Sequence, residues 1–124
     1  MNQKSRYVKI LSVKNSLILA DECYVANSFF DRVKGLLGGK LLAPGQGMLL
    51  RPCNDIHMWF MKIPLDVVFM HTQGGKVIVT SVRKNLQPWK VLPVRDGRAS
   101  ETLELPVGTI ERCDLRPGDE LCIS

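Results

Sequence analysis

Residues 65–82 read LDVVFMHTQGGKVIVTSV, and this stretch decides the fold class of the chain. Two runs rich in valine, isoleucine and leucine, 65–70 and 77–82, lie on either side of Gln73-Gly74-Gly75. Glycine adopts positive φ without a steric penalty, so a glycine pair between two such runs is typical of a tight β-hairpin. The sequence therefore predicts two antiparallel strands joined by a short turn.

The chain before this hairpin predicts further strands and a helix. Runs 7–13 and 17–20 are separated by a short polar gap, which is typical of another hairpin. Residues 28–39 predict a short helix that Ser28 caps and that lays an apolar face against the sheet. A short strand is expected over residues 47–50.

Residues 56–61, IHMWFM, predict the most informative strand. A two-residue period places His57, Trp59 and Met61 on one face, and large apolar groups occupy the other face as well. We therefore expect a central strand of a closed or covered sheet rather than an exposed edge. Pro64 ends this strand, because proline has no N–H to donate to a ladder.

The chain after the hairpin predicts a long loop over 86–98, a strand over 102–105 and a final strand over 120–123. Between the last two, Thr109 is expected to cap a short helix over 110–115. About seven strands and two short helices result, connected by hairpins rather than βαβ units. The predicted fold class is α+β and β-rich: a small barrel-like or strongly rolled, mostly antiparallel sheet with a helix across one opening.

Length and composition indicate one globular domain. The chain has 124 residues, close to the commonest domain size, so a single domain over residues 1–124 is expected. Apolar residues make up 45% and charged residues 23%, values that exclude a disordered chain or a coiled coil. The formal net charge of +5 permits loose attraction to anions, yet the basic residues are scattered along the chain. The pattern argues against nucleic-acid binding, and we expect a monomer or small homo-oligomer.

The sequence also predicts a soluble protein of a reducing compartment. No run approaches the roughly 18 apolar residues of a membrane helix, and no apolar segment typical of a signal peptide follows the first residues. Cys23, Cys53, Cys113 and Cys122 include no Cys-x-x-Cys pair, and a core of this size does not require disulfides. We expect a cytoplasmic location with reduced thiols, unless an export segment was removed.

Several short motifs together resemble a known family. They are RVKGLL at 32–37, GMLL at 47–50, IHMWFMKIPLDVVF at 56–69, LELPVG at 103–108 and Gly118-Asp119. In this order and spacing they resemble the bacterial and archaeal family called domain of unknown function 192, over roughly Ala20 to Leu121. The resemblance implies a small β-barrel-like α+β domain and brings no assigned activity. Some members of such families carry export or lipoprotein signals.

His57 and Asp66 are the candidate catalytic residues. His57 would act as a general base, a proton-sensitive switch or an anion contact, or else be a core histidine bonded to the backbone or to Asp66. Asp66 lies within an apolar strand, where a carboxylate is costly unless it is paired. Its expected partners are Arg32, Lys62, Arg95 and His57. A buried structural ion pair explains this burial with fewer residues than a catalytic acid requires.

Neither a metal nor a cofactor is expected. Cys53 and His57 are four positions apart, which on an extended strand separates them by roughly 13 Å. This distance is too long for one ion, and it is equally unfavourable for a Cys-His nucleophile pair. The glycines at 35–47 lack the Gly-Lys-Ser/Thr of a phosphate loop.

Aromatic and basic residues predict a half-apolar pocket beside the 56–61 strand. If Trp89 on the long loop folds over the face of His57 and Trp59, Arg32 and His57 would lie at the rim of a small-molecule site. The tryptophans and methionines are also ordinary core residues. The complete set of ligand-binding candidates is Arg32, Met48, His57, Trp59, Met61, Asp66 and Trp89.

Three functions follow from these candidates. The preferred one is a binding or accessory domain that holds a small anionic ligand or a peptide in this pocket without turnover. The second is a hydrolase-like enzyme that uses His57 and Asp66 as an acid/base pair. The third is a structural interaction module that has no pocket and acts through a sheet edge.

Overall fold

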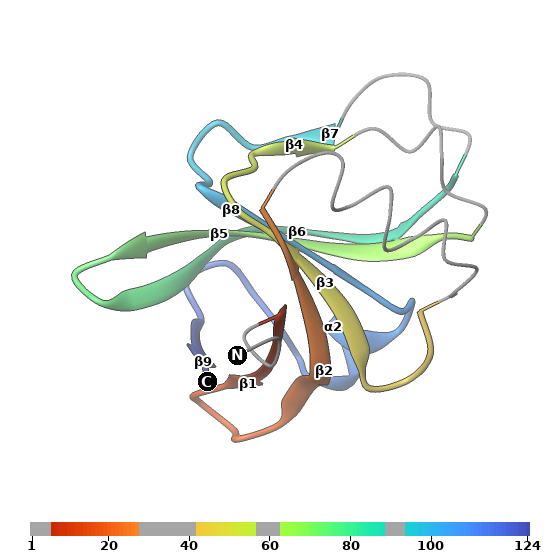
Figure 1. Ribbon diagram of the computed structural model, residues 1–124, viewed down its shortest axis with the longest axis horizontal. Coiled ribbons are helices and arrows are strands. Elements are labelled where there is room, and N and C mark those ends of the chain that lie inside the picture. Colours follow the sequence, from red (N-terminus) through yellow and green to blue (C-terminus); the bar gives the residue numbers. More distant parts are fainter. Residues whose placement is uncertain (1–5, 28–41, 57–62, 89–93) are drawn as a thin grey trace.

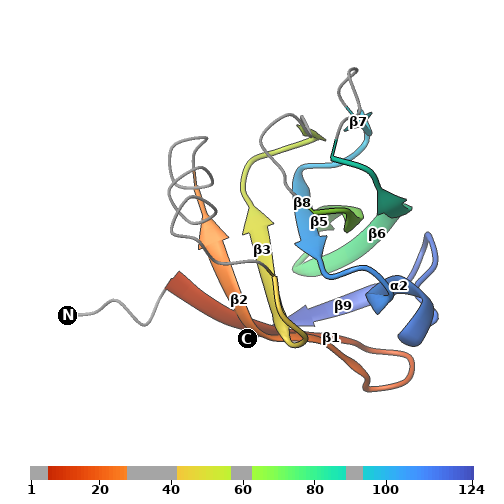
Figure 2. The ribbon, with the colours of Figure 1, turned by 90° about the vertical axis from the view of Figure 1, so that its right-hand side faces the viewer.

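A computed structural model describes residues 6–27, 42–56, 63–88 and 94–124. Within these residues, seven strands close into a barrel in the order β1-β2-β3-β8-β5-β6-β9 (Figures 1 and 2). Neighbouring strands are antiparallel except β2 and β3, which are parallel. The strands are β1 (Tyr7–Ser12), β2 (Ile18–Ala26), β3 (Gln46–Leu50), β5 (Leu65–Gln73), β6 (Lys76–Leu86), β8 (Glu101–Leu105) and β9 (Glu120–Ile123). The predicted β-rich barrel is confirmed.

The two predicted hairpins are present. β5 and β6 pair in antiparallel register from Gln73 opposite Lys76 to Leu65 opposite Leu86. Gly74 and Gly75 connect them with φ of 60° and 80°, the positive values that a tight hairpin turn requires. β1 and β2 form the other hairpin. Both strands of the first hairpin are longer than predicted, because pairing continues through polar residues at either end.

A second, two-stranded sheet corrects two of the predictions. β4 (Asp55–Ile56) pairs with β7 (Val94–Arg95) and lies outside the barrel. Ile56 therefore does not begin a central barrel strand; the remainder of the predicted 56–61 strand lies outside the described residues. The predicted 86–98 loop contains β7. The two-stranded sheet packs on the barrel and buries its apolar side chains, as a central barrel strand does. The apolar sequence pattern therefore does not distinguish a strand of this small sheet from a central strand of the barrel.

Side chains are buried on both faces of the central strands. The inner face of the barrel carries one large apolar cluster, which includes Val68, Met70, Leu103 and Leu105. A second cluster, which includes Leu65, Val67 and Phe69 from β5, lies on the outer face with Ile56 and Val94 from the small sheet. β5 and β8 are consequently buried along most of their length.

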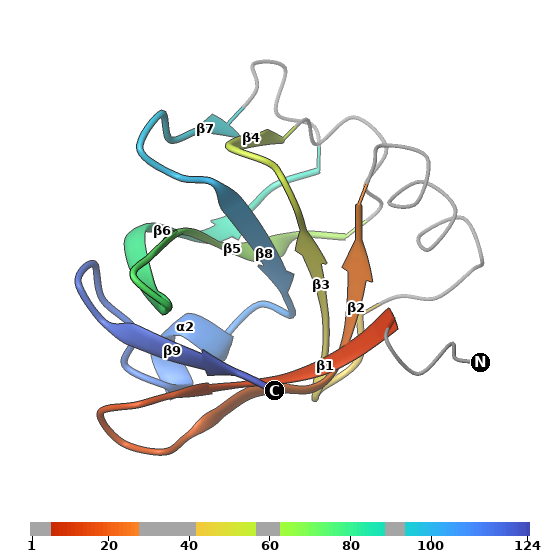
Figure 3. The ribbon, with the colours of Figure 1, turned by 60° about the vertical axis from the view of Figure 1, so that its left-hand side comes forward.

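The helix α2 (Thr109–Arg112) lies at the opposite end of the barrel from the β4–β7 sheet (Figures 1 and 3). Its N-cap residue is Gly108, which has a left-handed backbone conformation. Because glycine has no side chain, the N-cap residue makes no side-chain hydrogen bond to the helix. The hydroxyl of Thr109 donates to the carbonyl of Pro106 at 2.8 Å, so the prediction of Thr109 as cap is wrong. The helix is also shorter than the predicted 110–115. The other predicted helix, 28–39, lies outside the described residues.

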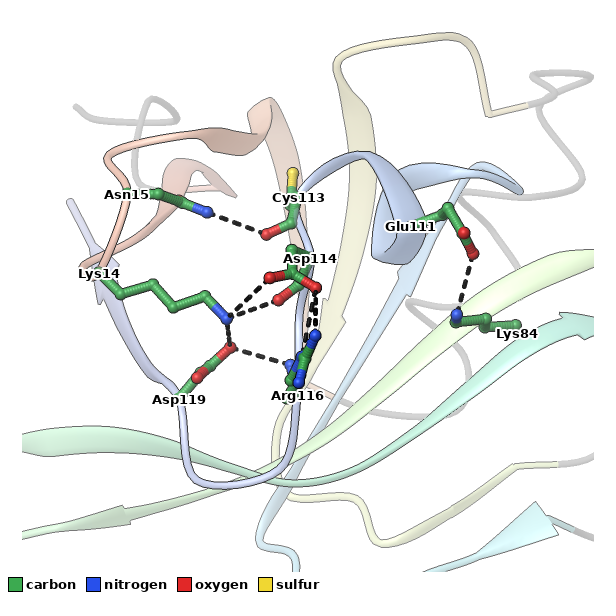
Figure 4. Close-up of polar contacts among 8 residues, drawn as sticks. All are labelled: Lys14, Asn15, Lys84, Glu111, Cys113, Asp114, Arg116 and Asp119. Carbon is green, nitrogen blue, oxygen red and sulfur yellow. Dashed lines mark hydrogen bonds and ion pairs between the residues drawn. The ribbon is translucent and has the colours of Figure 1, made fainter.

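A polar cluster ties this end of the barrel together (Figure 4). Lys14, in the β1–β2 turn, donates to the Asp114 carbonyl at 2.6 Å and pairs with Asp119 at 2.8 Å. The amide of Asn15 donates to the Cys113 carbonyl at 3.1 Å. These donors satisfy carbonyl groups at the C-terminal end of α2 that lack partners within the helix. The N-terminal hairpin therefore fixes α2 in place.

Candidate functional site

The structure describes two of the seven ligand-binding candidates, and they lie on opposite faces of the barrel wall. Asp66 alternates along β5 with outer-face residues and therefore points inward, whereas Met48 packs on the outer face with Ala26 and Leu50. The other candidates, Arg32, His57, Trp59, Met61 and Trp89, lie outside the described residues.

Asp66 is bonded to the protein backbone. Its side chain is 1% exposed, and its Oδ1 atom accepts a hydrogen bond from the N–H of Asn85 at 2.9 Å. Its Oδ2 atom accepts from Gly108 at 3.1 Å and from Ile110 at 3.0 Å. Asp66 thus supplies, from β5, the side-chain acceptor for the first N–H groups of α2, which have no other side-chain cap.

One of the four ion-pair partners expected for Asp66 lies in the described part of the chain. This partner, Arg95, does not pair with Asp66, and no other described basic side chain does. Arg32, His57 and Lys62 lie outside the described residues, so an ion pair with them stays a prediction. Within the described residues, backbone N–H groups satisfy the buried side chain of Asp66.

Residues in register define the outer face. One row across the sheet runs from Met48 on β3 through Glu104 on β8 and Val67 on β5 to Arg83 on β6. Paired residues in neighbouring strands project from the same side of a sheet, so these four side chains share the outer face. We call this set the outer-face row.

The ends of three segments meet in the outer-face cluster. Leu42 follows segment 28–41, Ile56 and Ile63 flank segment 57–62, and Leu86 and Val94 lie on either side of segment 89–93; all five join this one apolar cluster. These segments carry Arg32, His57, Trp59, Met61 and Trp89. The chain therefore leaves segment 28–41 at this cluster, and it enters and leaves the other two segments next to the same cluster.

Glu104 is the residue of this face that the sequence analysis missed. Its side chain is 0% exposed although its register partners, Met48 and Val67, are apolar. The alternation in Leu103-Glu104-Leu105 predicts a solvent-facing glutamate, because a period of two does not reveal that a sheet is covered on both sides. The signal that would have found it is a carboxylate inside the LELPVG motif.

Arg83, at the end of the row, was also not among the candidates. Its guanidinium carbon lies 5.6 Å from the centroid of the Phe69 ring, and that ring is fully buried. This distance is within the range of a cation–π contact. A cationic group is therefore held against the outer face next to the apolar cluster.

A shallow pocket adjoins the small sheet. It has a volume of about 310 Å³ and is lined by Pro52, Cys53, Asn54, Ala99 and Ser100. This volume is at the lower end of the range for small-molecule sites, roughly 300–1,000 Å³. The walls are held by two short bonds, from Thr102 Oγ1 to the Cys53 carbonyl at 2.9 Å and from Cys53 N to the Ser100 carbonyl at 3.0 Å.

The carboxylate of Asp96 fixes the loop between β7 and β8 to β6. Its Oδ2 atom accepts from Ser81 at 2.6 Å and Thr80 at 2.7 Å, and its Oδ1 atom accepts from Arg98 N at 3.0 Å. Burial alone would raise the pKa of Asp96, but these hydrogen bonds outweigh it and hold the pKa well below its ordinary value. Asp96 is therefore an ionised structural anchor.

The described residues of the barrel interior form a packed core. Apolar side chains fill it, and at the end away from α2 Glu101 pairs with Arg51 at 2.6 Å and accepts from Thr72 at 2.7 Å. Burial raises the pKa of Cys23 on the inner face to about 12, with Arg51 opposing the rise, so this thiol is unreactive. Small barrels are commonly filled in this way, which leaves the outer face for binding.

The described residues contain no group of three histidine, cysteine or acidic side chains arranged to hold a metal ion. Cys23, Cys53, Cys113 and Cys122 all lie in the described part of the chain, and none of them forms a disulfide. None of the helices in the described part of the chain is long and apolar enough to cross a membrane.

Two solved structures resemble this one. A protein of unknown function from Novosphingobium aromaticivorans has a TM-score of 0.74 and 22% identity, covering 94% of this chain and 83% of its own. A protein from Sinorhizobium meliloti, provisionally described as a transcription regulator, has a TM-score of 0.73 and 25% identity, covering 93% of this chain and 90% of its own. Both support the fold.

Sequence relatives identify the family. A UPF0127 protein of Thermococcus sibiricus is 31% identical over 105 residues, 78% of this chain. The match spans 62% of that relative's length. The DUF192 family model, described as "Uncharacterized ACR", matches residues 10–123. The chain belongs to the DUF192 family, as its motifs predicted.

Proposed function

We propose that this chain is a binding domain that holds a small anionic ligand or a peptide segment on the outer face of the barrel, without turnover. One observation supports the proposal: each of the three candidate-bearing segments has at least one flanking residue in the apolar cluster on that face. The site would combine the aromatic and basic residues predicted from the sequence with Arg83 of the outer-face row. An apolar surface with a few polar groups is the usual form of such a site.

The geometry of Asp66 favours binding over acid/base catalysis. A general base needs a free oxygen within reach of the proton that it takes. Both oxygens of Asp66 already accept backbone hydrogen bonds, and the side chain points to the opposite face from the outer-face cluster. The enzyme hypothesis would therefore need an acid other than Asp66.

The charge pattern of this chain argues against nucleic-acid binding. Its 17 basic residues are scattered along the sequence, and nucleic-acid binding domains usually gather them on one face or helix.

A thermal-shift screen tests the proposal. Wild-type protein and His57→Ala are screened against carboxylates, nucleotides, sugars, metal ions, short peptides and a DNA duplex. A ligand that binds only the native state raises the melting temperature by mass action. At a concentration of one hundred times Kd it increases the free energy of unfolding by about 2.7 kcal/mol. We expect an anionic hit in the wild type that weakens in His57→Ala.

The second histidine provides a matched control. His71 lies on β5 near the turn and is half-buried, so His71→Ala removes the same chemical group elsewhere. The hit should persist in His71→Ala. A screen without hits, or a hit that both variants retain equally, contradicts the proposal and favours the structural module. A DNA duplex as the strongest hit would favour the description of the Sinorhizobium protein instead.

A further inference from the structure

We propose that Arg83 binds the carboxylate group of a small ligand that has an apolar body. This inference rests on the proposed function, and it names one residue and one ligand class for the outer face.

The environment of Arg83 fixes its orientation. The residue lies on β6 opposite Val67, and its guanidinium carbon lies 5.6 Å from the centroid of the Phe69 ring. Phe69 and Val67 are both 0% exposed, so they form a rigid support. Stacking on an aromatic ring positions a guanidinium without using its N–H groups.

The hydrogen-bonding groups of Arg83 are mostly unused within the described residues. One of its N–H groups donates to the Val82 carbonyl at 3.2 Å. Arg51, Arg98 and Arg116 each form an ion pair with a carboxylate. Among the described acidic residues, none forms an ion pair with Arg83. A half-buried guanidinium has lost part of its hydration, and its remaining donors match the two oxygens of a carboxylate.

The surroundings of Arg83 select the rest of the ligand. Half-buried Leu86 and Ile63 belong to the same apolar cluster as Phe69, and they offer contacts to an apolar body. These apolar contacts leave the guanidinium of Arg83 as the charged group of this part of the described face, and its planar fork matches the two oxygens of one carboxylate. A monocarboxylate with an apolar body therefore fits better than a phosphate dianion.

Titrations with three simple anions test the inference on the full chain. Benzoate, acetate and inorganic phosphate are titrated at constant ionic strength and followed by amide chemical shifts and melting temperature. We expect saturable binding with benzoate stronger than acetate, and acetate stronger than phosphate. Arg83→Met keeps much of the apolar stem and removes the charge, and it should weaken benzoate binding about tenfold or more, since a charge-assisted hydrogen bond contributes about 1.5–3 kcal/mol.

Two further variants test whether binding depends on the planar guanidinium group of Arg83 rather than on net charge or on folding. Arg83→Lys keeps the charge and should fall between wild type and Arg83→Met, because an ammonium group lacks the planar fork. Arg112 is exposed on α2, at the other end of the barrel, so Arg112→Met removes the same charge there and should bind benzoate within about twofold of wild type.

Equal benzoate affinity in Arg83→Met and Arg112→Met would overturn the inference. So would a wild-type response that grows without saturation, which indicates a general salt effect. In either case, a hit in the thermal-shift screen that is lost in His57→Ala would still support the proposed binding function. A thermal-shift screen without any hit would contradict the proposed function too.

Discussion

Asp66 accepts hydrogen bonds from three backbone N–H groups, those of Asn85, Gly108 and Ile110, and thereby joins β5, β6 and α2. The sequence correctly indicated that this carboxylate is buried and structurally satisfied, because apolar residues surround it in the strand. The sequence did not reveal which groups donate hydrogen bonds to Asp66. Every residue except proline has a backbone N–H group, so the residue types do not show which N–H groups are the donors. Glu104 was missed because its strand alternates like one that is exposed on one side.

Removing the Asp66 carboxylate should destabilise the protein strongly. In Asp66→Ala three backbone N–H groups lose their buried acceptor, and we expect a loss on the order of 3–5 kcal/mol in the free energy of unfolding. Denaturant titration measures it. Asp114→Asn is the matched control, because Asp114 is exposed and asparagine tolerates its positive φ of 50°. The control should change stability by less than about 1 kcal/mol. Equal effects of the two substitutions would contradict the capping role.

The β5–β6 hairpin was the element most accessible to prediction. Its two glycines and flanking aliphatic runs specify turn and strands locally, within one stretch of chain. The two-residue strands β4 and β7 could not be predicted, because a strand of this length has no period to detect. Their pairing depends instead on packing against the outer face of the barrel.

Substituting the turn glycine tests the hairpin geometry. Gly75 has φ of 80°, where a Cβ atom is disfavoured, so Gly75→Ala should cost about 1–2 kcal/mol. Gly97→Ala is the control, since Gly97 has no positive φ and an added Cβ would meet nothing within 4 Å. The control should be neutral or slightly stabilising. Thermal unfolding compares the two, and a Gly75→Ala variant as stable as Gly97→Ala would rule out the assigned turn.

The link between β6 and the β7–β8 loop should depend on pH. The pKa of folded Asp96 lies below its unfolded value of about 3.9, so its ionised form contributes stability at neutral pH. This contribution is lost as the pH falls below about 4 toward the folded pKa, because the unfolded chain binds the proton first. We expect Asp96→Asn to lose about 2 kcal/mol at pH 7 and to show a flatter decline of stability between about pH 5 and 2.5 than wild type. Parallel pH profiles of the two proteins would contradict the anchor.

Closure of the barrel determines which groups of the whole molecule are reachable. The ion pair at one end and the α2 cap at the other enclose the inner face, which is why we propose a ligand site on the outer face. The sequence predicted a barrel-like sheet from the number of strands and hairpins. It could not predict which face binds, because that depends on register between strands far apart in the chain.

The four cysteines report on this enclosure. Cys122 is exposed and Cys53 is half-buried, whereas Cys23 and Cys113 are buried on the inner side with raised pKa values due to burial. We expect iodoacetamide at pH 8 to label Cys122 first and Cys53 more slowly. Cys23 and Cys113 should react only when the protein unfolds. Mass spectrometry of peptides gives the order, and early labelling of Cys23 would show that the barrel is open.

Amide chemical-shift mapping shows directly whether ligands bind on the outer face. The strongest hit from the thermal-shift screen is titrated into the labelled protein. We expect saturable shifts centred on Val67, Phe69, Arg83 and Leu86, and no comparable shifts around Lys14, Asp114 and Asp119 at the α2 end. Shifts centred on the α2 end would show that the ligand does not bind on the outer face.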